Sequence, residues 1–163
     1  MADAFEELAG RLREDGVGSM SVFRWECGRV AIGLDPMTLA VWGQIVVDLA
    51  GLLSVRDPIV GVVVKRPFGD DEVQNAAWDL IAGEDLREAR LRRCNEVLRS
   101  IRDGFISPEA VDAWLMVCND VRMVIAGPDM DAEMMQTLYE SEHPRGVIVQ
   151  LATALQAELL EIC

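Results

Sequence analysis

A chain of 163 residues is long enough for one ordinary domain with a sizeable hydrophobic core. Its residues are 51% hydrophobic and 26% charged, which is a globular balance and excludes a disordered or low-complexity chain. The formal net charge of −13 argues against direct binding to DNA, RNA or anionic lipid, because those partners attract a basic surface.

The N-terminal residues and the cysteines indicate a cytoplasmic protein without a metal or cofactor. Residues 1–7 show no basic region ahead of an apolar core, so no secretory signal is expected. The most apolar stretch, residues 39–55, contains Gln44 and Asp48 and is short for a membrane span, which indicates a core helix. Four cysteines without close pairs and a single histidine, His143, argue against structural zinc.

Residues 1–20 are expected to form an arm or a short helix ahead of a single helical domain over residues 21–163. Apolar residues of the arm share one helical face, and glycines then break the pattern. These apolar residues are Phe5, Leu8, Ala9 and Leu12. In the domain, two short apolar runs flank Cys27-Gly28, which predicts a β-hairpin because glycine supplies the positive φ of a tight turn. We expect no other β structure.

Apolar periodicity predicts a mainly α fold, a helical bundle of five to six helices with that small N-terminal β-hairpin. Asp35-Pro36 is a helix-start signal, and the apolar run after it continues to about residue 53. Gly83 is expected to separate two later helices, and Gly104 to cap the second of them. The later helices are expected over residues 70–81, 84–102, 107–126 and 144–162, with a short Met-rich helix near 130–138.

Two of these segments carry further expectations. Val73, Leu80 and Ile81 recur at the helical spacing that is typical of an apolar face turned to a core. Residues 58–65 carry conflicting signals, because Asp57-Pro58 repeats the helix start while the β-branched run after it favours a strand. From the residues alone both interpretations stay open.

Motifs for catalysis are missing, so we expect no enzyme. There is no nucleophile elbow or hydrolytic triad, and Lys65, the one lysine, lies outside any phosphate-binding loop. Six arginines instead gather on the helix over residues 84–102. They either pair with acidic residues of the same helix, which we favour, or form a docking face for an acidic partner. These candidate contact residues are Arg87, Arg90, Arg92, Arg93, Arg99 and Arg102.

Cys94 and Cys118 lie on the apolar stripes of two helices that are expected to form an αα-hairpin, so they could face each other. Facing helix axes lie about 8–10 Å apart, which brings some Cβ pairs near disulfide range. The pair is therefore a redox candidate, although two buried, inert thiols are the favoured interpretation. Cys27 and Cys163 are expected to be more exposed.

Several short motifs occur in an order and spacing that resemble one family. Over about residues 21–161 the chain resembles the actinobacterial family named for the oxidative stress regulator AosR, formerly a domain of unknown function. Its most specific signature comprises Trp114, Asn119, Asp120 and Arg122, whereas Val149 and Leu151 stand where aromatic residues are expected. The other motifs are Asp57-Pro58, Pro67-Phe68, Asp70-Asp71, Asp85-Leu86-Arg87 with Arg90 and Asn95, and Thr153 with Leu155-Gln156.

The resemblance implies a redox-responsive transcriptional regulator that acts with a sigma factor or RNA polymerase, and it favours helix at residues 58–65. An acidic protein fits this role through protein–protein contact. If the redox behaviour extends to this chain, a Cys94–Cys118 bridge is the expected switch. Two alternatives are an adaptor in Clp-type proteolysis and a small-ligand-binding helical domain. A homo-oligomer is compatible with each of them.

Overall fold

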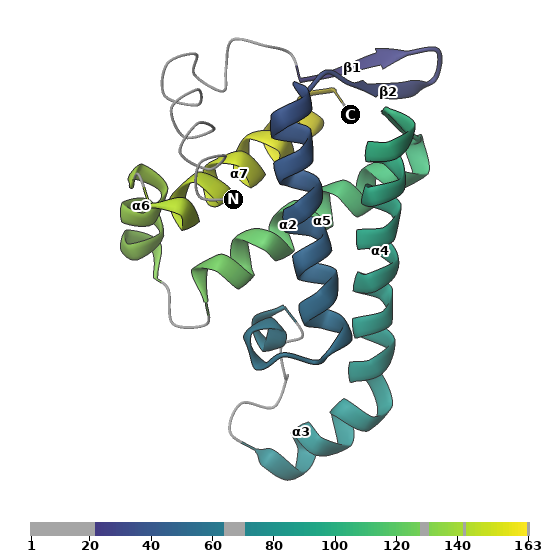
Figure 1. Cartoon of the computed structure of the whole chain (residues 1–163). Helices are drawn as coiled ribbons and strands as arrows, with labels where there is room; N and C mark the ends of the chain where they lie inside the picture. Colours follow the sequence, from purple (N-terminus) through teal and green to yellow (C-terminus); the bar gives the residue numbers. More distant parts are fainter. Residues whose placement is uncertain (1–21, 64–70, 128–130, 142, 163) are drawn as a thin grey trace.

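The computed structural model describes residues 22–63, 71–127, 131–141 and 143–162, so the expected arm over residues 1–20 lies outside the described residues. The fold is mainly α with a small antiparallel sheet, as predicted. Helices α2 and α4 run side by side, and α5 and α7 cross behind α2 (Figure 1). The α-helices are α2 (Pro36–Ser54), α3 (Glu72–Trp78), α4 (Glu84–Asp103), α5 (Val111–Ala126), α6 (Ala132–Glu140) and α7 (Pro144–Ile162). The other elements are strands β1 (Phe23–Glu26), β2 (Arg29–Ile32) and β3 (Phe105–Ile106), 3₁₀ turns η1 (Pro58–Val62) and η3 (Pro108–Ala110), and the π-helical turn η2 (Asp79–Gly83).

The predicted hairpin is confirmed, and its turn has the expected chemistry. Cys27 and Gly28 have φ values of 51° and 79°, the two positive angles of a two-residue hairpin turn. The expectation of no other β structure is wrong, because β3 pairs with β2 with Val30 opposite Ile106. A two-residue strand is too short to show any periodicity in the sequence. The indole N–H of Trp25 donates to the Ile162 carbonyl and so ties the hairpin to the end of α7.

Helix α2 begins where Asp35-Pro36 predicts. The Asp35 carboxylate accepts hydrogen bonds from the backbone N–H groups of Met37 and Thr38 at 3.0 and 3.1 Å. Among the described residues, α2 is the one helix whose length and apolar composition would suffice for a membrane span. It nevertheless buries one face in the protein, with Trp42 and Leu53 fully enclosed, as a core helix does.

The structure resolves the conflict at residues 58–65 in favour of a helical turn over the part it describes. Pro58–Val62 form the 3₁₀ turn η1, and the Asp57 carboxylate accepts from the Ile59 N–H at 3.0 Å. Val60 and Val63 are buried by this turn. The cap and the proline at the first position therefore outweigh the β propensity of the valines.

Gly83 lies between α3 and α4 as predicted, at the point where η2 ends and α4 begins, but it does not interrupt the helical backbone. Residues 72–103 form one continuous helical rod in which η2 joins α3 to α4. Gly83 has ordinary helical angles, φ −62° and ψ −39°. A glycine lowers the stability of a helix, but the helix ends there only if the backbone leaves the helical φ and ψ angles. Here the chain changes direction within the wider π-helical turn η2.

The second half of the chain follows the predictions closely. Gly104 adopts the left-handed conformation, φ 77°, that ends α4, and α4 and α5 pack as the expected αα-hairpin. Trp114 of α5 lies at the centre of the core, edge-on to Phe23 and stacked with Trp42 at centroid distances of 5.7 and 6.3 Å. Helix α7 begins at Pro144 and packs along α5.

Candidate functional site

Residues 72–83, comprising α3 and η2 and here named the α3 arm, project from one end of the bundle (Figure 1). Val73, Leu80 and Ile81 of this arm are 81, 86 and 79% exposed. The expectation that these residues face a core is therefore wrong. Helical spacing identifies an amphipathic helix, but it does not identify the surface that the apolar face meets.

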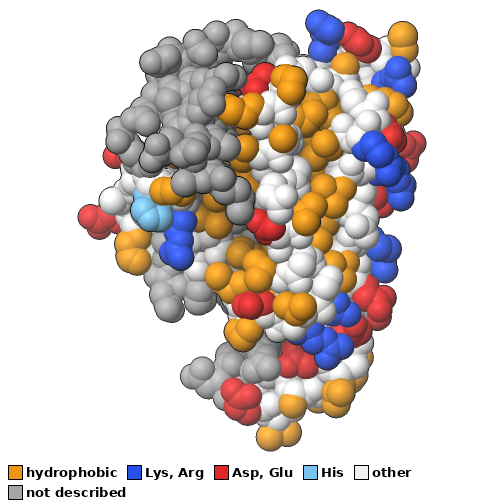
Figure 2. All heavy atoms as spheres, in the orientation of Figure 1, with side chains coloured by type: hydrophobic (Ala, Val, Ile, Leu, Met, Phe, Trp, Pro, Cys, Tyr) orange, Lys and Arg blue, Asp and Glu red, His pale blue; other side chains and the backbone are white. Residues whose placement is uncertain are grey.

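The arm is acidic as well as apolar. Residues 71–86 contain no lysine or arginine, and their acidic residues are Asp71, Glu72, Asp79, Glu84 and Asp85. Asp71 caps α3 by accepting from the Gln74 N–H at 3.0 Å, and the Gln74 hydrogen bonds hold the pKa of the Asp71 carboxyl below its ordinary value. Figure 2 shows hydrophobic side chains beside acidic ones at this end of the molecule. Such a surface is complementary to a basic partner with an apolar centre.

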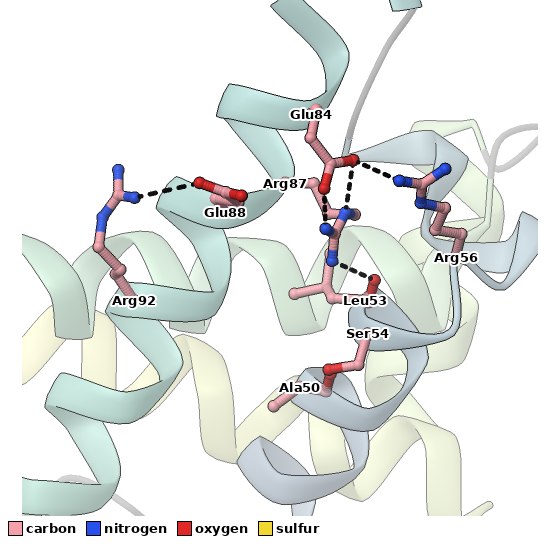
Figure 3. Close-up of polar contacts among 8 residues, drawn as sticks. All are labelled: Ala50, Leu53, Ser54, Arg56, Glu84, Arg87, Glu88 and Arg92. Atoms are coloured by element: carbon pink, nitrogen blue, oxygen red, sulfur yellow. Dashed lines mark hydrogen bonds and ion pairs between the residues drawn. The ribbon is translucent and has the colours of Figure 1, made fainter.

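An ion-pair cluster fixes the base of the α3 arm (Figure 3). The Glu84 carboxylate accepts two hydrogen bonds from Arg87, and it also accepts from Arg56 at 2.8 Å. Arg87 in turn donates to the Leu53 carbonyl at the end of α2 at 3.3 Å. The hydrogen bonds from Arg87 hold the pKa of the Glu84 carboxyl below its ordinary value. The cluster therefore anchors the start of α4, and the arm before it, to α2.

A cavity of about 330 Å³ lies beside this cluster. Its lining includes Arg56, Asp57, Asp79, Glu84 and Arg87, so both signs of charge reach it. Within the described part of the chain no three histidine, cysteine or acidic side chains are placed to hold a metal ion. The cavity suits a polar side chain of a partner better than a reacting substrate, because its charged groups are already paired. Asp57, Pro58 and Arg87, which belong to two of the short motifs noted in the sequence, meet here.

The six arginines of α4 do not share one surface. Arg87, Arg90 and Arg93 turn inward, with side chains that are 17, 11 and 29% exposed. Arg92 and Arg102 are outward, where they lie 3.9 Å from Glu88 and 3.5 Å from Asp103 (Figure 3 shows the first pair). The favoured pairing interpretation fits this arrangement. The sixth, Arg99, is also exposed on α4.

The signature residues on α5 connect helices within the domain. Asp120 is buried and forms an ion pair with Arg90 of α4, while Trp114 fills the core. Arg122 donates to the Gln156 side chain of α7 at 2.9 Å. Asn119 donates to the Met123 sulfur one turn along α5 at 3.3 Å. These four residues therefore contribute to packing, and the buried pair Arg90–Asp120 links α4 to α5.

Cys94 and Cys118 are buried free thiols, which agrees with the favoured interpretation. Burial raises the pKa of the Cys94 thiol to about 12, and it raises the pKa of the Cys118 thiol further. A thiol with such a pKa contains almost no thiolate near neutral pH, so it reacts slowly with oxidants. Cys27 lies exposed at the hairpin turn.

Sequence reasoning missed the α3 arm as a surface. The available signal was the run of acidic residues over 71–86 without one basic residue, next to apolar residues that find no partner in the bundle. Arg56 was missed because it is an isolated arginine after α2, and only the fold brings it to Glu84.

These features define a mainly helical domain with an exposed, acidic and apolar arm and, among the described residues, no cluster of side chains that could hold a metal ion. The sequence matches the family described as a domain of unknown function (DUF2017) over residues 20–163, and the chain belongs to that family. No curated protein and no solved structure matches it.

Proposed function

We propose that this chain is a cytoplasmic regulatory protein that binds a sigma factor or an RNA polymerase subunit through its α3 arm. The observation that carries the proposal is the exposure of Val73, Leu80 and Ile81 on a helix that projects from the bundle. Apolar side chains left in water at one site are typical of a surface that a partner covers.

The energetics of the arm support this kind of contact. Covering one large aliphatic side chain contributes roughly 1.5–3 kcal/mol, so three of them can anchor a small interface. The surrounding carboxylates repel acidic partners and speed the approach of basic ones. The partner surface is therefore an apolar groove with lysine or arginine at its rim.

The resemblance to the AosR family supports transcription machinery as the source of that surface. The acidic charge of the whole chain disfavours direct DNA contact, so an effect on transcription would pass through a protein. The paired state of Arg87 and Glu84 supports a positioning role for the cluster, which holds the arm in place without chemistry of its own.

Affinity capture with three full-length baits tests the proposal. The baits are the wild type, Leu80→Gln with Ile81→Gln, and Leu160→Gln as a matched control, since Leu160 is 62% exposed on α7. From lysate of the source organism, the wild type and the control should retain a sigma factor or polymerase subunit, and the arm variant should lose it. Melting temperatures of the three proteins should agree, because glutamine preserves helix propensity.

Two results would overturn the proposal. Equal retention by the arm variant and the control would remove the α3 arm from the interface. The transcriptional role would be ruled out if the wild type captured neither a sigma factor nor a polymerase subunit under both reducing and oxidising conditions. Enrichment of a Clp component instead would favour the adaptor alternative.

A further inference from the structure

An apolar groove runs along α2 on the face that meets α5 and α7. Its volume is about 490 Å³, and Asp48 is the one charged residue among the described residues that line it. Gln44 donates to the Asp48 carboxylate at 2.8 Å, so the polar groups of the rim satisfy each other. The apolar lining includes Val41, Ile45, Leu49, Val124, Ile125 and Ile148.

The chemistry of the groove selects its occupant. A fatty acid would place a carboxylate near Asp48 with no lysine or arginine beside it, which is unfavourable. An amphipathic helix matches better, because it covers an apolar groove with residues spaced three and four apart and leaves its polar face in water. A cationic side chain next to its apolar stripe would complement Asp48.

We propose that residues 3–15 of this same chain occupy the groove as an amphipathic helix. This segment precedes the described residues and carries Phe5, Leu8, Ala9 and Leu12 at helical spacing. Arg11 and Arg13 flank Leu12, so the segment also supplies the cation that Asp48 lacks. The proposal is independent of the function assigned to the α3 arm.

The chain length allows this contact within one molecule. The backbone N–H of Val22 donates to the Glu158 carboxylate at 3.4 Å, so the chain enters the domain beside α7. From Glu158 back to Ile148, at the groove, is roughly 15 Å along the helix. Residues 16–21, which link this helix to Val22, span up to about 20 Å when extended, which exceeds the distance needed.

The lengths of the two partners also agree. A helix over residues 3–15 is roughly 20 Å long at 1.5 Å per residue. The lined stretch of α2 from Met37 to Leu52 has nearly the same length, roughly 22 Å. The segment therefore acts as a built-in occupant, and any partner or ligand of the groove must displace it.

Hydrogen exchange on full-length variants tests the proposal. The test variant is Phe5→Ser/Leu8→Ser/Leu12→Ser, and the matched control is Glu7→Ser/Glu14→Ser, which changes the opposite face of the same helix. Residues 37–52 and 121–125 should lose protection in the test variant and keep it in the control. A labelled peptide of residues 1–15 should then bind the test variant, restore protection, and fail to bind when Ile45→Asp is added.

Each outcome decides the proposal. Equal protection in both variants, or a peptide that does not bind the test variant, would overturn it. Light scattering distinguishes docking within one chain from docking between two copies. A wild-type monomer whose groove is protected from hydrogen exchange supports docking within one chain. A protected dimer that loses protection on dilution would assign the groove to a second copy instead.

Discussion

At the scale of single residues, burial sets the reactivity of the cysteine thiols. The thiolate is the reactive form of cysteine, and burial raises the pKa of the Cys94 thiol to about 12. The nearby Asp120 carboxylate contributes to this rise of the pKa, while Arg90 opposes it. A switch that uses Cys94 and Cys118 would therefore need the α4–α5 hairpin to open first.

Alkylation of the native protein should be fast at the exposed cysteine and slow at the two buried ones. With iodoacetamide at pH 8, Cys27 should be modified while Cys94 and Cys118 stay unmodified until denaturant is added. Peptide mapping by mass spectrometry gives the extent at each site. Modification of Cys94 or Cys118 at the rate of Cys27 would contradict the expectation and show that the core opens readily. The same mapping after mild peroxide treatment tests the bridge between the two.

At the scale of elements, the sequence predicts best where one or two residues fix local geometry. Asp35-Pro36 and Cys27-Gly28 were sufficient to place the start of α2 and the hairpin turn, because a cap and a positive φ are local requirements. The strand β3 and the exposure of Leu80 depend on what packs beside them. Such tertiary context has no local signal, which is why both predictions failed.

The buried pair Arg90–Asp120 joins α4 to α5, and its effect on the free energy of unfolding can be measured by mutation. Asp120→Ala leaves the Arg90 charge buried without its partner, so the free energy of unfolding should fall by about 3–5 kcal/mol. Replacing both residues by leucine should recover most of that loss, because no unpaired charge remains. Urea unfolding of the wild type and the two variants measures these differences. A double variant no more stable than Asp120→Ala would show that the pair has a role beyond neutralising Arg90.

Asp120 also gives the pair a defined pH dependence. Burial raises the pKa of its carboxyl above the ordinary value, against the opposing effect of Arg90. The folded state therefore binds a proton more readily than the unfolded state, and the stability from this group is lost as pH rises through the folded pKa. Relative to Asp120→Asn, which does not titrate, the wild type should gain stability as pH falls from 7 towards 4. A constant difference between the two proteins would contradict this sign.

At the scale of the whole molecule, the sign of the net charge argues against direct contact with DNA. The net charge is −13, and the inward arginines of α4 are neutralised within the fold. Specific duplex binding releases counterions from phosphates that basic side chains contact, so affinity falls steeply with salt. Here the acidic surface repels the phosphates, and lowering the salt strengthens that repulsion because the screening decreases.

The isolated protein should accordingly give no gel shift with promoter DNA at any salt concentration. Its effect on transcription would then appear only when the polymerase or sigma factor is present. A footprinting assay with the complete polymerase, with and without this protein, provides the comparison. The Leu80→Gln/Ile81→Gln variant should remove any change seen there, since the proposed contact is made by the α3 arm. A tight shift by the protein alone, weakening as salt rises, would show that phosphate contacts prevail over the net charge.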